Sequence, residues 1–265
     1  MKIYISADIE GTCGIVNWEE TNLNSSLGKY HQIQMSKEVG YACEGANDLN
    51  CDYILVKDAH GSARSIQHSY LPKNTELLRG WANNPHIMMA GISNDFDATL
   101  FIGYHSGGGK NGNPLAHTMN HSKYDYIKIN DTIASEFTIN AYTSAYYNVP
   151  VAFLSGDELL CKSAKDLNPN IVTVPVSKGI GNASISIHPD LALENIRIGV
   201  KEALSGDISR HLIKLPTVFV IEIKFKNHFD AYKASFYPGC KLINSSTILF
   251  ETNNYYEFLR MFLFI

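Results

Sequence analysis

The chain has 265 residues, of which 45% are hydrophobic and 18% are charged. This composition excludes an intrinsically disordered protein and supplies enough apolar side chains for one large domain or two unequal ones. The formal net charge of −4 gives no general attraction to nucleic acid or to an anionic membrane surface. Because no apolar run approaches the roughly 20 residues of a membrane span, we expect neither nucleic acid nor a membrane as a partner.

Five cysteines are spread along the chain and form no CxxC motif. An odd number of widely spaced cysteines, in a chain long enough to build its own core, argues against a disulfide framework. The first residues reach the acidic Asp8 before an apolar segment typical of a secretory signal can form. We therefore expect reduced thiols and a cytoplasmic location.

Hydrophobic periodicity predicts strands that alternate with helices over most of the chain. Strands are expected at residues 3–7, 53–56, 98–102, 124–129, 151–154 and 171–176. Helices are expected at residues 33–46, 134–147 and 191–204. This alternation predicts an α/β fold in which a mainly parallel sheet lies between layers of helices, a three-layer α/β/α arrangement.

The pattern changes after Gly206, where a long alternating strand is expected at 217–225, a short helix at 231–235 and a strand at 247–251. The apolar residues 261–265 are expected to pack as a terminal helix or strand. We therefore divide the chain into an α/β catalytic domain at 1–205 and a smaller α+β region at 206–265, which serves packing or oligomerisation.

Potential metal ligands follow three of the predicted strands. Asp8 and Glu10 come after the first strand, His60 after the second and His105 after the third. Ligands of open α/β sheets bind outside the carboxyl ends of the strands, so these side chains are expected to converge. One such histidine alone is more often a solvated loop residue, but three strands ending this way favour a metal site. Carboxylates and imidazoles together suit Zn²⁺ or a similar first-row divalent ion.

Other motifs allow two interpretations each. Residues 107–112 fit G-x-G-x-x-G, but no clear helix start follows, so a flexible active-site loop is favoured over a nucleotide site. His117 and His121 are four residues apart without the glutamate of H-E-x-x-H, and by themselves they are typical of a polar surface pair. Asp157 and Glu158 follow another strand, where they either line the same crevice and hold a substrate ammonium or cap a helix.

Several sequence blocks together carry a family resemblance. They are Ser6-Ala-Asp8-Ile-Glu10-Gly11, Lys57-Asp-Ala-His60-Gly, Phe101-Ile-Gly-Tyr-His105, Leu115-Ala-His117-Thr-Met, Ala134-Ser-Glu136-Phe-Thr-Ile-Asn140-Ala and Val149-Pro-Val-Ala-Phe-Leu-Ser-Gly-Asp157. In this order and spacing they resemble the M55 peptidase family, the D-aminopeptidases related to the dipeptide-transport-operon protein of bacilli. The resemblance covers residues 1–205 well and the remainder more loosely.

The resemblance implies a binuclear zinc site, with two Zn²⁺ ions per chain. Asp8 is similar to the family's bridging carboxylate, Glu10 and His60 would complete one zinc site, and His105 and Glu136 the other. His117 matches the family's catalytic residue, described as a nucleophile, and would move a proton or stabilise the tetrahedral oxyanion. Glu136 is identified by the resemblance alone.

The resemblance also implies a homodecamer of two stacked pentameric rings and substrates that are short peptides with an N-terminal D-residue. We therefore expect a binuclear zinc aminopeptidase that hydrolyses short peptides or amides with an N-terminal, D-configured amino acid. Two alternatives remain open: a binuclear metallohydrolase acting on another amide or a phosphoester, and a non-catalytic protein for peptide binding or assembly.

Overall fold

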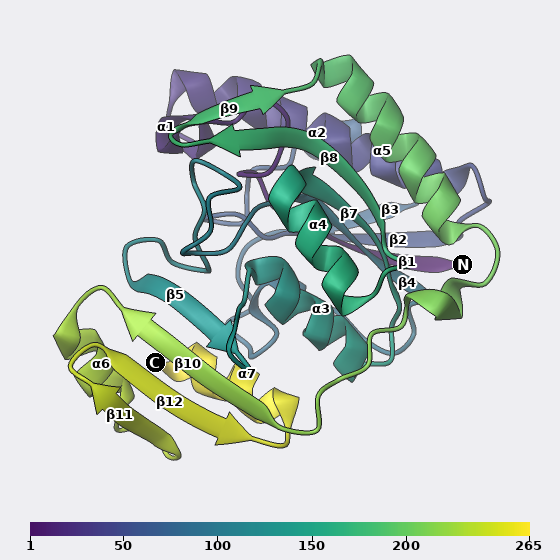
Figure 1. Cartoon of the computed structure of the whole chain (residues 1–265). Coiled ribbons are helices and arrows are strands. Elements are labelled where there is room, and N and C mark those ends of the chain that lie inside the picture. Colours follow the sequence, from purple (N-terminus) through teal and green to yellow (C-terminus); the bar gives the residue numbers. More distant parts are fainter.

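The computed structural model describes residues 1–265, which form two sheets with flanking helices (Figure 1). The first sheet contains β1 (Lys2–Ala7), β2 (Tyr53–Asp58), β3 (Thr75–Leu78), β4 (Ala98–Tyr104), β7 (Val151–Asp157), β8 (Val172–Ile180) and β9 (Ala183–Ser186). Its order is β3-β2-β1-β4-β7-β8-β9. All neighbouring strands are parallel except β9, which runs antiparallel to β8.

Helices cover both faces of this sheet. The helices α2 (Ser26–Asn47) and α5 (Pro189–Leu204) pack on one face, and α3 (Glu136–Tyr146) and α4 (Glu158–Leu167) on the other. Side chains of β1 alternate between the two faces, so Ile3 and Ile5 join the core beneath α2 and α5, whereas Tyr4 joins the core beneath α3 and α4. The predicted three-layer α/β/α arrangement is confirmed.

Local sequence explains how α5 begins and how it packs on α2. Pro189 occupies the first turn of α5, where its missing N–H costs nothing. Gly45 of α2 allows the two helices to approach closely, because a Cβ there would lie 2.5 Å from the carbonyl oxygen of Arg197. The guanidinium of Arg197 pairs with Glu44 at 2.9 Å and Asp48 at 2.8 Å, which fixes the relative position of the helices.

The second sheet is antiparallel and lies beside the first. It contains β5 (Tyr124–Ile129), β6 (Thr132–Ile133), β10 (Phe219–Phe225), β11 (Cys240–Asn244) and β12 (Thr247–Thr252), in the order β11-β12-β10-β5-β6. The helices α6 (His228–Ala234) and α7 (Tyr255–Phe264) pack on it and share its core. The predicted C-terminal α+β region is therefore present, but it also recruits β5 and β6 from the first 205 residues. The division of the chain at residue 205 stays a prediction.

Most of the predicted elements are present, although the helix expected at 33–46 already begins at Ser26 and the strand expected at 171–176 runs on to Ile180. The expected strand at 124–129 is β5, which pairs with β10 in the antiparallel sheet. On its other side the tight turn at Asn130-Asp131 returns the chain as β6. The terminal apolar residues belong mostly to α7. Periodicity does not predict α1 (Trp18–Thr21), β3, β6, α4, β9, β11 or the short 3₁₀ helices η1 (His68–Tyr70), η2 (Ile87–Met89) and η3 (Ile208–His211). None of the helices combines the length and apolarity needed to cross a membrane.

Candidate functional site

Three adjacent strands bring their carboxyl ends to one edge of the seven-stranded sheet. β1 pairs with β2 on one side and with β4 on the other. Asp8, His60 and His105 follow these strands within two residues, so the sheet register places their backbones side by side. The structure brings these side chains together with Glu10, as strand order alone leads one to expect.

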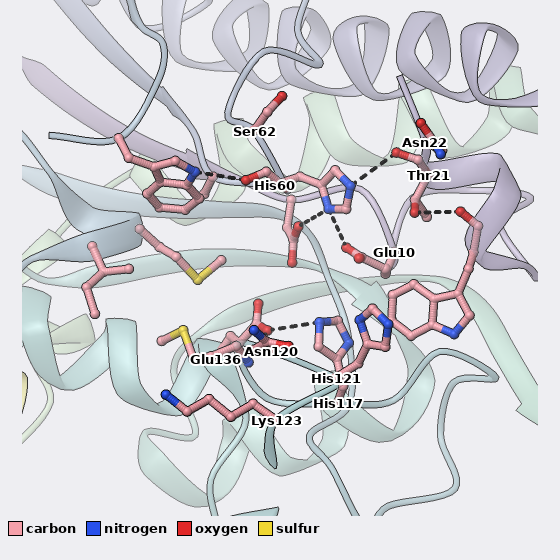
Figure 2. Close-up of a pocket in the computed structure, with 18 of the residues that line it drawn as sticks. Glu10, Thr21, Asn22, His60, Ser62, His117, Asn120, His121, Lys123 and Glu136 are labelled. Atoms are coloured by element: carbon pink, nitrogen blue, oxygen red, sulfur yellow. Dashed lines mark hydrogen bonds and ion pairs between the residues drawn. The ribbon is translucent and has the colours of Figure 1, made fainter. Parts of the chain in front are cut away.

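A pocket of about 750 Å³ opens at this edge (Figure 2). Five of the six predicted site residues line it: Asp8, Glu10, His60, His117 and Glu136. The sixth, His105, lies behind this surface and is fully buried. A pocket with converging polar groups at the end of parallel strands is the expected place for a ligand in this fold.

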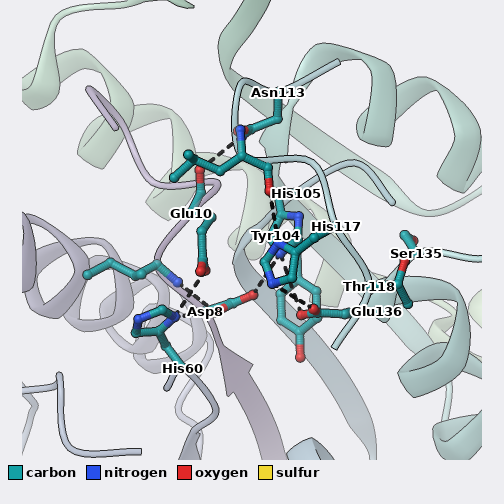
Figure 3. A network of polar contacts seen from close by, with 12 residues as sticks. Asp8, Glu10, His60, Tyr104, His105, Asn113, His117, Thr118, Ser135 and Glu136 are labelled. Carbon is teal, nitrogen blue, oxygen red and sulfur yellow. Dashed lines mark hydrogen bonds and ion pairs between the residues drawn. The ribbon is translucent and has the colours of Figure 1, made fainter. Parts of the chain in front are cut away.

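Asp8, Glu10 and His60 form what we call the first group, whose potential ligand atoms all lie within 4.8 Å of one another (Figure 3). Nδ1 of His60 is 3.1 Å from Oε2 of Glu10 and 3.4 Å from Oδ1 of Asp8. Nε2 of the same ring donates to the backbone carbonyl of Thr21 at 3.2 Å. This bond turns Nδ1 toward the carboxylates, as is typical of a metal-binding imidazole whose other nitrogen is held by the protein.

His105, His117 and Glu136 form the second group, whose potential ligand atoms also lie within 4.8 Å of one another. Nε2 of His105 is 3.6 Å from Oε2 of Glu136, and Nε2 of His117 is 3.4 Å from Oε1. Both rings donate through Nδ1 to backbone carbonyls, His105 to Ser106 at 3.0 Å and His117 to Leu115 at 2.8 Å. The two imidazoles stack with their centroids 4.3 Å apart. Each ring therefore presents Nε2 toward the carboxylate.

Glu136 owes its place to the start of α3. Ser135 caps this helix, and its hydroxyl accepts the N–H of Thr138 at 3.1 Å. Glu136 is consequently the first helical residue, and its Oε1 accepts the backbone N–H of Met119 at 2.6 Å. That bond ties the loop carrying His117 to the helix. A sequence signal for Glu136 exists in the Ser135 cap, but it marks the helix start and not a ligand.

Asp8 lies between the two groups. Its Oδ1 faces His60, and its Oδ2 is 3.4 Å from Nε2 of His105. Both Oδ2 of Asp8 and Nε2 of His105 are buried without a hydrogen-bond partner. Buried polar atoms are rarely left in this state, and a cation between them would satisfy both. The donor set therefore fits a pair of metal ions that share Asp8.

The buried carboxylates of the site also favour binding of a cation. Burial opposes a positive charge on His60 and on His105, but the carboxylates of Glu10 and Glu136 outweigh it and raise the pKa of both imidazoles well above the usual range. Burial likewise opposes the charge of Asp8, yet the imidazoles of His105 and His60, each with a ring nitrogen 3.4 Å from a carboxylate oxygen of Asp8, hold its pKa well below the usual value. Three buried carboxylates thus draw positive charge toward them, which metal ions supply without protons.

Residues of the short helix α1 contact both groups, and sequence patterns give no signal for them. Trp18 stacks on His121 with centroids 4.0 Å apart and meets His117 edge to face at 5.1 Å. Thr21 in the same helix supplies the carbonyl that holds His60. His121 lines the pocket next to His117, so these two histidines are not the isolated surface pair that their spacing alone indicates.

The remaining sequence candidates have structural roles. Asp157 is fully buried, caps α4 through the N–H of Leu160 and accepts two hydrogen bonds from Ser106 at 2.6 Å. Glu158 pairs with Lys162 outside the pocket. The helix-cap interpretation therefore holds, and neither acid lines the pocket to bind a substrate ammonium. The glycine-rich segment 107–112 packs against neighbouring backbone and opens no helix, which disfavours a nucleotide site.

Comparisons with known proteins match the chain to one family. A sequence model of the M55 peptidase family, described as D-aminopeptidase, matches residues 1–264. A D-aminopeptidase of Bacillus subtilis (strain 168) is 28% identical over 264 residues, which cover 97% of this chain and 93% of that protein. The structure is similar to that of the Zn-dependent D-aminopeptidase DppA from Bacillus subtilis, described as a self-compartmentalizing protease. The TM-score is 0.91 at 26% identity, and the likeness covers 99% of this chain and 96% of that one.

Both the fold and the family match extend over the two sheets, including the divergent part after residue 205. Because the family model matches nearly the whole chain, this protein belongs to the M55 peptidase family of D-aminopeptidases.

Proposed function

We propose that this protein is a zinc-dependent aminopeptidase that hydrolyses short peptides with an N-terminal D-amino acid. Membership of the family and the zinc dependence of the similar DppA support the class of reaction and the metal. The observation that carries the proposal is the position of Asp8, whose two carboxylate oxygens face two different groups of potential ligands.

Two zinc ions per chain are proposed, with Asp8 shared between them. Glu10 and His60 would complete the first site, and His105 and Glu136 the second. When bound, zinc supplies a Lewis acid that polarises the scissile carbonyl and lowers the pKa of a water molecule. The unpartnered Oδ2 of Asp8 and Nε2 of His105 support this assignment, because both atoms would gain a partner.

His117 is proposed as the catalytic residue. Its Nδ1 donates to the carbonyl of Leu115, so the lone pair of the neutral ring is on Nε2, beside Glu136 and at the pocket wall. A base in this position can take a proton from attacking water and return it to the leaving amine. Contact with Trp18 holds the ring in that orientation.

A homodecameric assembly and a cytoplasmic location complete the proposal. The similar DppA is described as self-compartmentalizing. Three aromatic side chains near α6 are 59% to 70% exposed, namely Phe229, Tyr232 and Phe236, and they offer an apolar surface for contacts between chains. Light scattering should give a mass several times that of one chain.

All five cysteines are unpaired, which suits a reducing compartment and supports the proposed cytoplasmic location.

The function is tested by supplying zinc-loaded protein with dipeptides and aminoacyl amides in both stereochemical series, with phosphoesters as a control class. We expect release of the N-terminal amino acid from D-configured substrates, loss of this activity on chelation, and recovery when zinc is added. Hydrolysis of the phosphoesters alone, or no hydrolysis of any peptide by zinc-loaded protein, would refute the proposal.

A further inference from the structure

One wall of the pocket is apolar and is built where the cores of the two sheets meet. Ile87 and Met88 from η2, Met119 from the loop before β5 and Phe262 from α7 line it. Met88 belongs to the core beneath α3 and α4, whereas Phe262 belongs to the core of the second sheet. Ile87 and Met119 are partly exposed and pack against both cores. Glu136 lines the same pocket (Figure 2), and its Oε1 accepts the backbone N–H of Met119.

Two residues of this wall have an unfavourable backbone conformation. The φ angle is +49° at Ile87 and +67° at Met119. Residues other than glycine and asparagine seldom adopt such φ angles, and a β-branched residue such as isoleucine is the least suited of all. The surroundings hold them there: the N–H of Met119 donates to Glu136, and the N–H of Ile87 donates to the carbonyl of Asn84 at 3.2 Å. The fold thus keeps large apolar side chains at two positions where glycine or asparagine would be less strained.

Strained residues that persist in a pocket point to a role in ligand binding. The bond from Met119 to Glu136 means that the wall and the second group are fixed to each other. A substrate held at the metal site therefore has apolar surface within reach of its side chains. An alanine methyl group would leave most of that surface in contact with water, whereas a longer apolar side chain would cover it.

We propose that Ile87, Met88, Met119 and Phe262 form a subsite for one apolar substrate side chain longer than a methyl group. This inference rests on the proposed peptidase function and names the class of peptide that the pocket prefers. Charged and small side chains are disfavoured there, the former because they lose hydration and the latter because they leave the wall uncovered. One extra methylene in an apolar pocket changes kcat/KM by about 10- to 200-fold, so we expect at least a tenfold preference for leucine over alanine.

The test uses zinc-loaded protein and dipeptides in which alanine, leucine or lysine is placed at each position in turn, in the stereochemical series that is hydrolysed. Leucine should exceed alanine at one position by about tenfold or more in kcat/KM, and lysine should be the poorest there. Equal rates for leucine and alanine at both positions would overturn the subsite while leaving the peptidase function intact. Absence of hydrolysis for every dipeptide would instead refute the peptidase function.

Variants then assign the preference to the wall. Asn tolerates positive φ, so Ile87→Asn and Met119→Asn keep the backbone while making the surface polar, and each should reduce the leucine-to-alanine ratio by about fivefold or more. Ile87→Gly removes the backbone strain together with the side chain, so it should lose the same preference. Ile185→Asn on β9 is the matched control, because this isoleucine is 62% exposed and outside the pocket. An unchanged ratio in all three wall variants would contradict the proposal.

Discussion

The first and second groups of candidate ligands lie side by side, but different kinds of structure hold them. Every residue of the first group follows a strand of the seven-stranded sheet within three residues, and strand register fixes their relative positions. In the second group only His105 does so, because His117 lies in a long loop and Glu136 begins a helix. A hydrogen bond from Met119 to Glu136 joins that loop to the helix. The first group and His105 thus depend on the sheet, whereas His117 and Glu136 depend on contacts between a loop and a helix.

Asp8 belongs to the first group and also contacts His105 of the second, so changing it should have the largest effect. We expect Asp8→Asn to lose both metal ions and to lower kcat/KM by at least about 10³-fold, since the variant lacks the charge that separates two nearby cations. Measurement of bound metal together with peptide hydrolysis checks this. Asp95→Asn, at an exposed aspartate, should behave as the wild type.

His117 separates catalysis from metal binding within the second group. His117→Ala should retain close to the wild-type zinc content while turnover falls by about 10²–10⁴-fold, the usual loss for an acid–base group. Elemental analysis and steady-state kinetics of the same sample decide the matter. Loss of one zinc would make His117 a ligand, and unchanged turnover would make it a structural residue.

Trp18 tests whether α1 positions the second group. Removing its indole takes away the ring that contacts both His117 and His121, so Trp18→Ala should lower kcat by about tenfold at constant zinc content. Trp18→Phe should restore most of the rate, because a flat apolar ring remains. Trp81→Ala is the control, since Trp81 lines the same pocket but makes no ring contact with either histidine. A fall in kcat/KM caused by KM alone would speak against positioning.

Glu38 is bonded to the loop that follows Glu10, and changing it is expected to affect the pH dependence of stability. This buried carboxyl accepts the N–H of Cys13, in the loop that follows Glu10, and burial raises its pKa from 4.5 to about 7. The folded state therefore holds a proton that the unfolded state has lost, and stability falls as pH rises from about 4.5 and reaches its lower level above about 7. The free energy of unfolding should drop by up to about 3 kcal/mol over this interval.

Glu38→Gln should remove that part of the pH dependence, because the amide keeps the hydrogen bond to Cys13 and carries no charge. Denaturant unfolding at pH 5 and pH 8 provides the measurement. The same pH slope in the variant and the wild type would show that Glu38 is not the responsible group.

The contrast between the groups also explains what could be predicted from the sequence. Parallel strands end at one edge, so apolar runs followed by Asp8, His60 and His105 suffice to place those residues together. Identifying Glu136 as a candidate ligand required the family resemblance, because the position of Glu136 depends on where α3 packs. Trp18 and Thr21 could not be predicted as site residues, because a four-residue helix shows no hydrophobic periodicity and their contacts arise only in the folded chain.

Prediction of the fold from sequence is limited in the same way, because local patterns do not show which distant segments pack together. Alternating strands and helices predict the three-layer part, and the structure contains it. Periodicity assigns a strand at 124–129 but cannot tell which sheet it joins, because its partner β10 lies almost a hundred residues later. Asp157 illustrates an ambiguity that only tertiary structure removes: an acid at a strand end can face a pocket or cap a helix, and here it caps α4.

The central claim is that two metal sites share Asp8, and the number of zinc ions bound per chain tests it most directly. Elemental analysis should be made on wild-type protein, Glu10→Gln and Glu136→Gln, all purified without chelator and supplied with zinc. We predict two ions per chain in the wild type and about one in each variant, because each substitution removes a carboxylate from a different site. One ion or none in the wild type, or two ions in both variants, would contradict the claim.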